Sequence, residues 1–212
     1  MVLFDLDGTL WDSAESVAES WNIEIERFLG KSGELVMTPD GIRANMGKTM
    51  DDIADTLMSA VELPRRYELA RCCEIFENSY IEEHGGNLFP GVRETLAALR
   101  DRGVKMAVVS NCQAGYVPAF LDSMKMHEYF VDYEEWGRSG LLKADNIRLV
   151  MERNGEDRAI YVGDIQKDAD ASAAAGVPCI WASYGFGHIE NPAATLTSFE
   201  ELPDVLEKLG FL

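Results

Sequence analysis

The sequence is poor in positive charge. It has 19 Lys and Arg residues against 37 Asp and Glu residues, which gives a formal net charge of −18 over 212 residues. Binding to nucleic acid depends on clustered Lys and Arg that displace counterions from phosphates. The composition therefore predicts that neither nucleic acid nor an anionic membrane surface is a partner. A small anionic substrate is compatible with this charge if a metal ion or a local lysine stands in its site.

Cysteine is also scarce, and long apolar runs are missing from the sequence. The four cysteines, Cys72, Cys73, Cys112 and Cys179, form no Cys-x-x-Cys pair. A chain of this length does not need disulfides to fold. No apolar run approaches the length of a membrane span, and no basic stretch precedes the apolar start. We therefore expect reduced thiols, a cytoplasmic location and no membrane anchor.

Four short apolar runs indicate buried strands: Val2 to Phe4, Val104 to Val109, Ala159 to Val162, and Val177 to Trp181. Continuous apolar character is typical of strands covered on both faces, as in a parallel sheet. Helical patterns follow these runs at Val92 to Arg102, Ala114 to Met124, Ala144 to Asn154, and Gln166 to Ala175. This alternation predicts the α/β class, with a Rossmann-like parallel sheet.

The stretch of residues 12–86 breaks the alternation. Its patterns are helical, at Ser13 to Leu29, Met50 to Val61, and Pro64 to His84. Roughly 75 residues of helix are too many for a simple crossover between two strands. We expect a core domain made of residues 1–11 and 87–212, and a helical domain of residues 12–86 inserted after the first strand.

Two carboxylates follow the first predicted strand, in the motif Asp5-Leu6-Asp7-Gly8-Thr9. Side chains at positions i and i+2 of an extended segment point the same way, so Asp5 and Asp7 should project together. Gly8 allows the backbone to turn sharply there. Ligands of open α/β sheets bind at the carboxyl ends of the strands, where this pair falls. For this motif alone, a pair of solvated acids at a strand end is an equal alternative.

A second acidic pair, Asp164 and Asp168, follows the third predicted strand after Gly163. The two acids are separated by about one helical turn and share a face. Carboxylate oxygens at an open polar site suit Mg²⁺, which prefers a few carboxylates, water and substrate phosphate. The pair therefore predicts a magnesium site.

Hydrogen-bond donors and a cation follow other elements. Ser110 and Asn111 end the second predicted strand and can donate to an oxyanion. Lys143 precedes a predicted helix and can bring a positive charge to the same edge. Taken singly, Ser and Asn are ordinary turn residues, and Lys143 would be a surface lysine.

In their order along the chain, these motifs resemble those of the haloacid dehalogenase superfamily of phosphohydrolases. The resemblance is carried by Asp5 to Thr9, Ser110-Asn111, Lys143, and Gly163 to Asp168. The helical insertion looks like the C1 cap of that superfamily. The overall pattern is most similar to phosphoglycolate phosphatases and related hydrolases of small phosphates. In one departure, Ala144 follows Lys143 where the family often has proline, which frees the backbone of the lysine.

The resemblance implies roles for these residues in hydrolysing a small phosphorylated substrate. Asp5 would attack phosphorus to form an aspartyl phosphate, and Asp7 would act as acid and then base, which needs a raised pKa. The implied Mg²⁺ ligands are Asp5, the backbone carbonyl of Asp7, and Asp164, with Asp168 in indirect contact. The residues implied to hold the phosphoryl oxygens are Ser110, Asn111 and Lys143. Lys48, in the loop from Arg43 to Met50, is the candidate for contacting the rest of the substrate, although a solvated turn lysine is at least as good an interpretation.

Two other functions compete with hydrolysis. A sugar-phosphate mutase of the same superfamily tends to carry a histidine shortly after the first motif, and Asp12 to Val17 contains none. A non-enzymatic phospho-acceptor switch protein also uses acids, Mg²⁺ and a lysine. It needs neither a second acid two residues after the acceptor nor a long helical insertion. The sequence leaves open whether the protein is a monomer or a homodimer.

Overall fold

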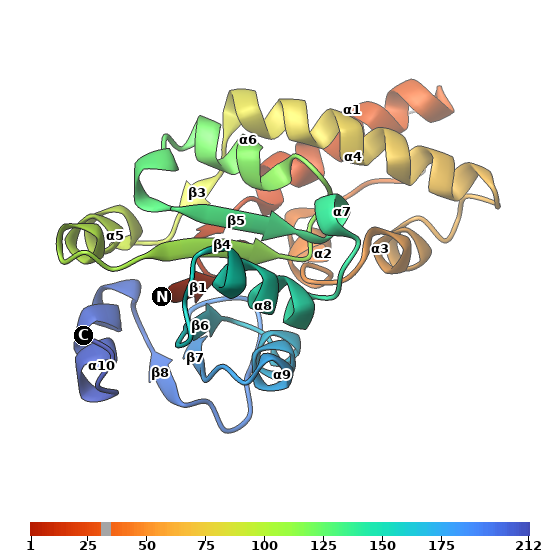
Figure 1. The fold of residues 1–212 in the computed structure, drawn as a ribbon. Coiled ribbons are helices and arrows are strands. Elements are labelled where there is room, and N and C mark those ends of the chain that lie inside the picture. The colour runs from red at the N-terminus through yellow and green to blue at the C-terminus, as the bar shows by residue number, and fades with distance from the viewer. Residues whose placement is uncertain (31–34) are drawn as a thin grey trace.

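The structure, a computed structural model, describes residues 1–30 and 35–212 and is built around a parallel six-stranded sheet (Figure 1). The strands, in the spatial order β5-β4-β1-β6-β7-β8, are β5 (Asp132–Glu135), β4 (Met106–Ser110), β1 (Val2–Phe4), β6 (Ile160–Gly163), β7 (Cys179–Ala182) and β8 (Ala194–Leu196). Every pairing in this sheet is parallel. The predicted α/β class and parallel sheet are confirmed.

Helices cover both faces of the sheet. The helices of this part are α5 (Val92–Asp101), α6 (Tyr116–Ser123), α7 (Trp136–Ser139), α8 (Lys143–Arg153), α9 (Gln166–Ala175) and α10 (Leu202–Lys208), with short 3-10 turns at His127–Tyr129 and Phe199–Glu201. Phe4 of β1 packs in one cluster with Leu96 of α5, and Leu3 packs in another with Ile147 of α8. Burial on both faces explains the continuous apolar runs. Among the described residues, no helix has the length and apolar character needed to cross a membrane.

In the described part of residues 13–86, four further helices, which we call the helical segment, lie between the short strands β2 (Trp11–Asp12) and β3 (Asn87–Leu88). They are α1 (Ala14–Leu29), α2 (Pro39–Arg43), α3 (Met50–Leu57) and α4 (Arg65–His84). β2 and β3 pair antiparallel, so the chain leaves the sheet and returns to it side by side. Figure 1 shows α2 and α3 beyond the carboxyl ends of β4 and β5. The division into domains at residues 12 and 86 remains a prediction, and residues 31–34 within that range lie outside the described part.

Within the six-stranded sheet, the strands β5 and β8 are not predicted by the sequence pattern. Both lie at the edges of the sheet. An edge strand is partly exposed, so it needs no continuous apolar run, and β5 reads Asp-Tyr-Glu-Glu. The helix predicted from Ala114 begins instead at Tyr116, because Gly115 has a φ of 94° that a helix does not accommodate.

Candidate active site

The turn after β1 brings two distant parts of the chain into contact. The N–H of Asp5 donates to the carbonyl of Val162 in β6 (2.9 Å). Gly8 has a φ of +83°, and a Cβ atom at this position would lie 2.1 Å from Oδ2 of Asp164. The turn therefore requires glycine both for its backbone conformation and for the close approach of Asp164.

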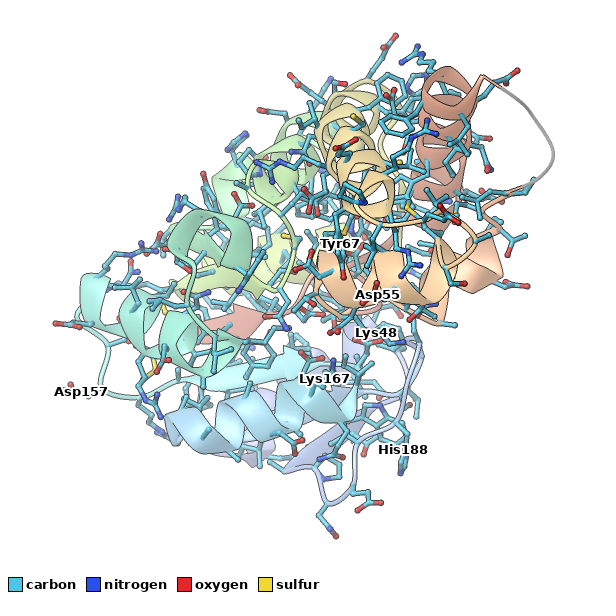
Figure 2. The ribbon with its side chains drawn as sticks, turned by 90° about the vertical axis from the view of Figure 1, so that its right-hand side faces the viewer. Lys48, Asp55, Tyr67, Asp157, Lys167 and His188 are labelled. Atoms are coloured by element: carbon cyan, nitrogen blue, oxygen red, sulfur yellow. The ribbon has the colours of Figure 1, made fainter. Side chains whose placement is uncertain are left out.

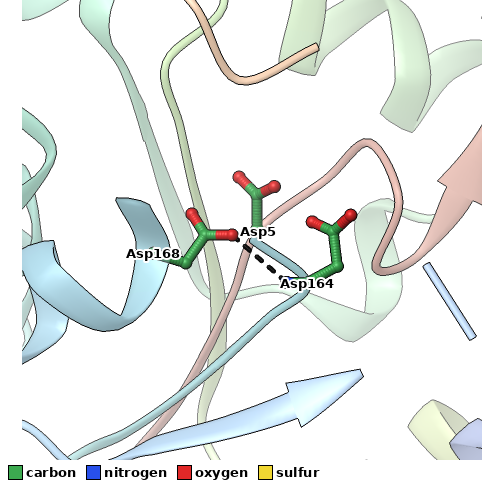
Figure 3. Close-up of side chains that lie close together, drawn as sticks. All are labelled: Asp5, Asp164 and Asp168. Atoms are coloured by element: carbon green, nitrogen blue, oxygen red, sulfur yellow. Dashed lines mark hydrogen bonds between the residues drawn. The ribbon is translucent and has the colours of Figure 1, made fainter. Parts of the chain in front are cut away.

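Three buried carboxylates meet at the carboxyl ends of β1 and β6 (Figure 3). Asp5, Asp164 and Asp168 each offer an oxygen, and these oxygens lie within 4.8 Å of one another. Asp168 is in the first turn of α9, where its Oδ2 accepts hydrogen bonds from the N–H groups of Asp164 and Ile165 (both 3.2 Å). Residues 159 positions apart in the sequence thus share one site, as the strand-end argument predicts.

Lys143 supplies the positive charge of this cluster. Its Nζ donates to Oδ1 of Asp5 (2.8 Å) and to Oδ1 of Asp168 (2.6 Å), and the side chain is only 4% exposed. Lys143 begins α8, with Nζ 5.7 Å from the ring centroid of Tyr161. The loss of the proline expected after Lys143 therefore does not keep the ammonium group away from the acids.

Burial and mutual repulsion shift the protonation of the cluster. Burial, helped by the charge of Asp168, raises the pKa of Asp5 to about 7. Burial and the charge of Asp5 raise the pKa of Asp164 to about 8. Burial opposes the charged form of Lys143, yet the charges of Asp168 and Asp5 raise its pKa well above the ordinary value. A divalent cation would relieve the repulsion between the acids and favour their ionised forms.

The oxygens left free in the cluster fit such a cation. Oδ1 of Asp5 and Oδ2 of Asp164 accept hydrogen bonds, from Lys143 and from the N–H of Phe186 (2.8 Å each). Within the described residues, the other oxygen of each carboxylate accepts none. Both oxygens of Asp168 are already engaged. Hard oxygen donors of this kind suit Mg²⁺, and the pattern favours Asp5 and Asp164 over Asp168 as direct ligands.

Asp7 is held apart from this cluster by two hydroxyl groups. Its Oδ1 accepts hydrogen bonds from Oγ of Ser13 (2.7 Å) and from the hydroxyl of Tyr116 (3.0 Å). Burial raises the pKa of Asp7 to about 6, although these hydrogen bonds oppose the shift. A carboxyl group that titrates near neutrality can both give and take a proton. The main cause of the shift is burial, and not the neighbouring carboxylates.

A cavity of about 70 Å³ joins most of the remaining candidate residues. The candidates that line it are Asp5, Asp7, Ser110, Asn111 and Lys48. Asp164 lines a smaller hollow that shares Asp5 and Asp7 with the cavity. Lys143 lines neither hollow and reaches the site through its hydrogen bond to Asp5.

The helical segment forms the wall of the cavity opposite the acids. Its contribution is mostly apolar and comprises Val17, Trp21, Ile42, Met46, Met50 and Ile53. Nζ of Lys48 donates to Oδ1 of Asn45 (2.7 Å), and Figure 2 shows Lys48 where the helical segment meets the core. The space beside the acids is therefore small, largely apolar and supplied with one further cation.

A model of the haloacid dehalogenase-like hydrolase family matches residues 2–182, which include every acid of the cluster. The chain belongs to this family. Among curated relatives, this hydrolase is 33% identical to a phosphoglycolate phosphatase of Pseudomonas savastanoi pv. phaseolicola, over 95% of this chain and 78% of the relative. It is 31% identical to a phosphoglycolate phosphatase of Photobacterium profundum, over 97% of this chain and 95% of the relative.

Solved structures resemble this haloacid dehalogenase-like hydrolase over nearly its whole length. A predicted phosphatase from Clostridium acetobutylicum is 26% identical with a TM-score of 0.75, covering 97% of both chains. CbbY from Rhodobacter sphaeroides, solved in complex with phosphate, is 22% identical with a TM-score of 0.76 over 95% of both chains, and so supports the fold alone. Family membership and the phosphatase relatives make this chain a phosphoric monoester hydrolase.

Several residues that contact the site of this hydrolase belong to none of the predicted motifs. Ser13 and Tyr116 bind Asp7. Glu77 of α4 lines the cavity and accepts hydrogen bonds from the indole N–H of Trp21 and from Gln113 (2.9 Å). Of these residues, only Ser13 stands in a local sequence pattern, because a serine directly before a helix is typical of a helix cap.

Proposed function

We propose that this phosphatase is Mg²⁺-dependent and hydrolyses a small phosphorylated metabolite through an aspartyl phosphate on Asp5. The observation that supports the proposal best is the convergence of Asp5, Asp164 and Lys143 in one buried cluster with unengaged carboxylate oxygens. We further propose that residues 12–86 act as a cap over this site. The enzyme would work in the cytoplasm, as a monomer or a homodimer.

In the proposed two-step reaction, Asp5 is the nucleophile and Asp7 transfers the protons. A carboxylate oxygen of Asp5 bonds to phosphorus as the bond to the leaving oxygen breaks, and Asp7 gives that oxygen a proton. Asp7 then removes a proton from a water molecule, whose oxygen bonds to phosphorus. The bond between phosphorus and Asp5 breaks, which releases inorganic phosphate and regenerates both acids.

The other site residues hold the reacting groups. Asp5, Asp164 and the backbone carbonyl of Asp7 would bind Mg²⁺, while Asp168 fixes Lys143 and the backbone of Asp164. When bound, the ion would neutralise charge on the phosphoryl group and on the carboxylates. The groups proposed to hold the phosphoryl oxygens are Ser110, Asn111 and Lys143.

The substrate is proposed to resemble phosphoglycolate. The curated relatives carry the name phosphoglycolate phosphatase, and the cavity beside the acids is small. Lys48 is the cation on the cavity wall that is available to a substrate carboxylate. We expect Lys48→Met to raise KM for phosphoglycolate, and to leave KM for p-nitrophenyl phosphate, which has no carboxylate, nearly unchanged.

The proposal is tested by the release of phosphate from p-nitrophenyl phosphate. Asp157 is an exposed acid far from the site, so Asp157→Asn is the matched control for Asp5→Asn (Figure 2). We expect the wild type and Asp157→Asn to turn over only with Mg²⁺, and Asp5→Asn to lose roughly a thousandfold or more. Equal rates for the Asp5 and Asp157 variants, or full turnover in excess chelator, would contradict the proposal.

A further inference from the structure

Oδ1 of Asp7 lies in a closed ring of three short contacts. It is 2.7 Å from Oγ of Ser13 and 3.0 Å from the hydroxyl oxygen of Tyr116, and those two hydroxyl oxygens are 2.7 Å apart. Ser13 is fully buried and Tyr116 is 2% exposed. The two hydroxyl groups are therefore shielded from bulk water, and between them they have two hydrogens for three contacts.

When Asp7 is ionised, the two hydroxyl hydrogens fix Oδ1 as a hydrogen-bond acceptor. If Ser13 donates to Asp7, Tyr116 can donate to the same oxygen or to Ser13. If Ser13 donates to Tyr116, Tyr116 donates to Asp7. Oδ1 accepts at least one hydrogen bond in each arrangement. In neutral Asp7, a proton on Oδ1 would have to donate to one hydroxyl group and leave a poorer acceptor for the other. A proton on Oδ2 keeps Oδ1 as a carbonyl oxygen, which accepts better, so we place the proton on Oδ2.

Oδ2 is the oxygen available to a substrate. Among the described residues it accepts no hydrogen bond, and Asp7 lines both the cavity and the hollow next to Asp164. The hydroxyl ring thus holds one side of the carboxyl group and leaves the proton-bearing side free.

The two hydroxyls come from separate parts of the fold, and neither serves its own helix. Ser13 directly precedes α1 but makes no capping hydrogen bond to it, although serine at that position ordinarily would. Tyr116 is the first residue of α6, and its ring packs against Trp11 with centroids 6.0 Å apart. Both hydroxyl groups therefore bind Asp7 and not their own helices.

We propose that Ser13 and Tyr116 are positioning residues that turn Oδ2 of Asp7 toward the leaving oxygen of the substrate. The inference rests on the proposed function, in which Asp7 is the general acid. As the bond from phosphorus to the leaving oxygen breaks and the bond to Asp5 forms, the proton on Oδ2 passes to the leaving oxygen. Without the hydroxyls the carboxyl group can rotate, and the proton spends less time in place.

The test measures kcat/KM for p-nitrophenyl, phenyl and ethyl phosphate with Tyr116→Phe and Ser13→Ala. p-Nitrophenolate leaves readily without a proton, whereas ethoxide does not. Since general acid catalysis contributes roughly 10²–10⁴-fold, we expect a loss of about tenfold or more for ethyl phosphate and under about threefold for p-nitrophenyl phosphate. Because kcat/KM reports steps up to formation of the aspartyl phosphate, the later water attack does not affect the comparison.

Two variants separate the possible outcomes. Tyr184→Phe removes a partly buried hydroxyl that donates to the carbonyl of Thr9 (2.9 Å), and it should lower kcat/KM equally, if at all, for the three esters. Asp7→Asn should show the same dependence on the leaving group as Tyr116→Phe, but more strongly. If Asp7→Asn shows that dependence and Tyr116→Phe does not, the positioning role is refuted. If Asp7→Asn lacks it, the acid role in the proposed function fails instead.

Discussion

Single residues at this site are placed for chemistry at a cost in stability. The hydroxyl of Ser13 binds Asp7 and does not cap α1, whose first N–H, that of Ala14, donates instead to Oδ1 of Asp12 (3.0 Å). Asp5, Asp168 and Lys143 are buried ionisable groups, and their ion pairs offset their desolvation only in part. Such costs are typical of groups that must keep a defined geometry around a substrate.

Glu77, a further buried carboxyl group that lines the cavity, allows the stability cost of burial to be measured. It is 4% exposed, and burial raises its pKa from 4.5 to about 7. Between these two values the folded protein keeps a proton that the unfolded chain has released. Stability therefore falls as the pH rises from 4.5 to 7, by on the order of 3 kcal/mol from this residue.

We expect Glu77→Gln, unfolded in the presence of chelator, to show a weaker loss of stability across this pH range than the wild type. The exposed Glu82 lies on the same helix, and Glu82→Gln should leave the wild-type slope unchanged. The measurement is the unfolding free energy from urea titrations at several pH values. An unchanged slope in Glu77→Gln would show that this carboxyl group is already ionised in the folded protein.

At the scale of elements, the edge strand β5 supports the loop that follows β4. Ser110 and Glu135 are paired in the register of the two strands. The carboxylate of Glu135 accepts hydrogen bonds from the N–H groups of Gly115 (2.6 Å) and Val117 (3.0 Å). An element without a proposed catalytic residue thus holds the chain between Ser110 and Tyr116.

We expect Glu135→Ala to lower both stability and activity. It leaves two N–H groups without an acceptor, at about 1–3 kcal/mol for each one that stays buried, and it frees the loop that follows Ser110. The matched variant is Glu134→Ala, which removes a buried carboxylate paired with Arg138 and Arg153. Thermal melts and kcat/KM on p-nitrophenyl phosphate should show stability lost in both variants and activity lost only in Glu135→Ala. Equal activity losses would contradict a specific role for Glu135.

The elements differ in how well the sequence predicts them. β1, β4, β6 and β7 are covered on both faces, so their burial is visible as continuous apolar runs. β5 and β8 have no such run because an edge strand is stabilised by its single neighbour and by side-chain pairs such as Arg153 with Asp132. The start of α6 was predicted two residues too early because the backbone of Gly115 ends the extended loop.

The same contrast holds for the site across the whole molecule. Asp5, Asp164 and Ser110 were predictable as a group because parallel strands bring their carboxyl ends to one edge of the sheet. Tyr116 was not, because its contact with Asp7 joins positions 109 residues apart through the packing of α6. Glu77 reaches the cavity from the helical segment, whose placement over the sheet has no signal in local sequence.

Because the acids of the cluster are buried, we expect metal binding, protonation and folding stability to depend on one another in the whole molecule. Because the pKa values of Asp5 and Asp164 are raised to about 7 and about 8, protons would compete with the proposed Mg²⁺ at lower pH. At a hundredfold excess over Kd, a bound Mg²⁺ ion would stabilise the fold by about 2.7 kcal/mol. We expect Mg²⁺ to raise Tm by several degrees at pH 8.5 and by much less at pH 5.5.

Asp164→Asn is the control for this effect. The net charge of −18 attracts cations everywhere on the surface, and that general attraction persists in the variant. A shift of Tm that is the same in the wild type and Asp164→Asn, or larger at pH 5.5 than at pH 8.5, would show that the cluster is not the binding site.

We propose that Asp5 becomes covalently phosphorylated, and borohydride trapping detects that intermediate itself. The enzyme is mixed with substrate and Mg²⁺, quenched, and reduced, which converts an aspartyl phosphate to homoserine. Peptide mass spectrometry then locates the altered residue. We expect homoserine at position 5, dependent on both substrate and Mg²⁺. Phosphate release without any altered aspartate, or with the alteration at another acid, would contradict it.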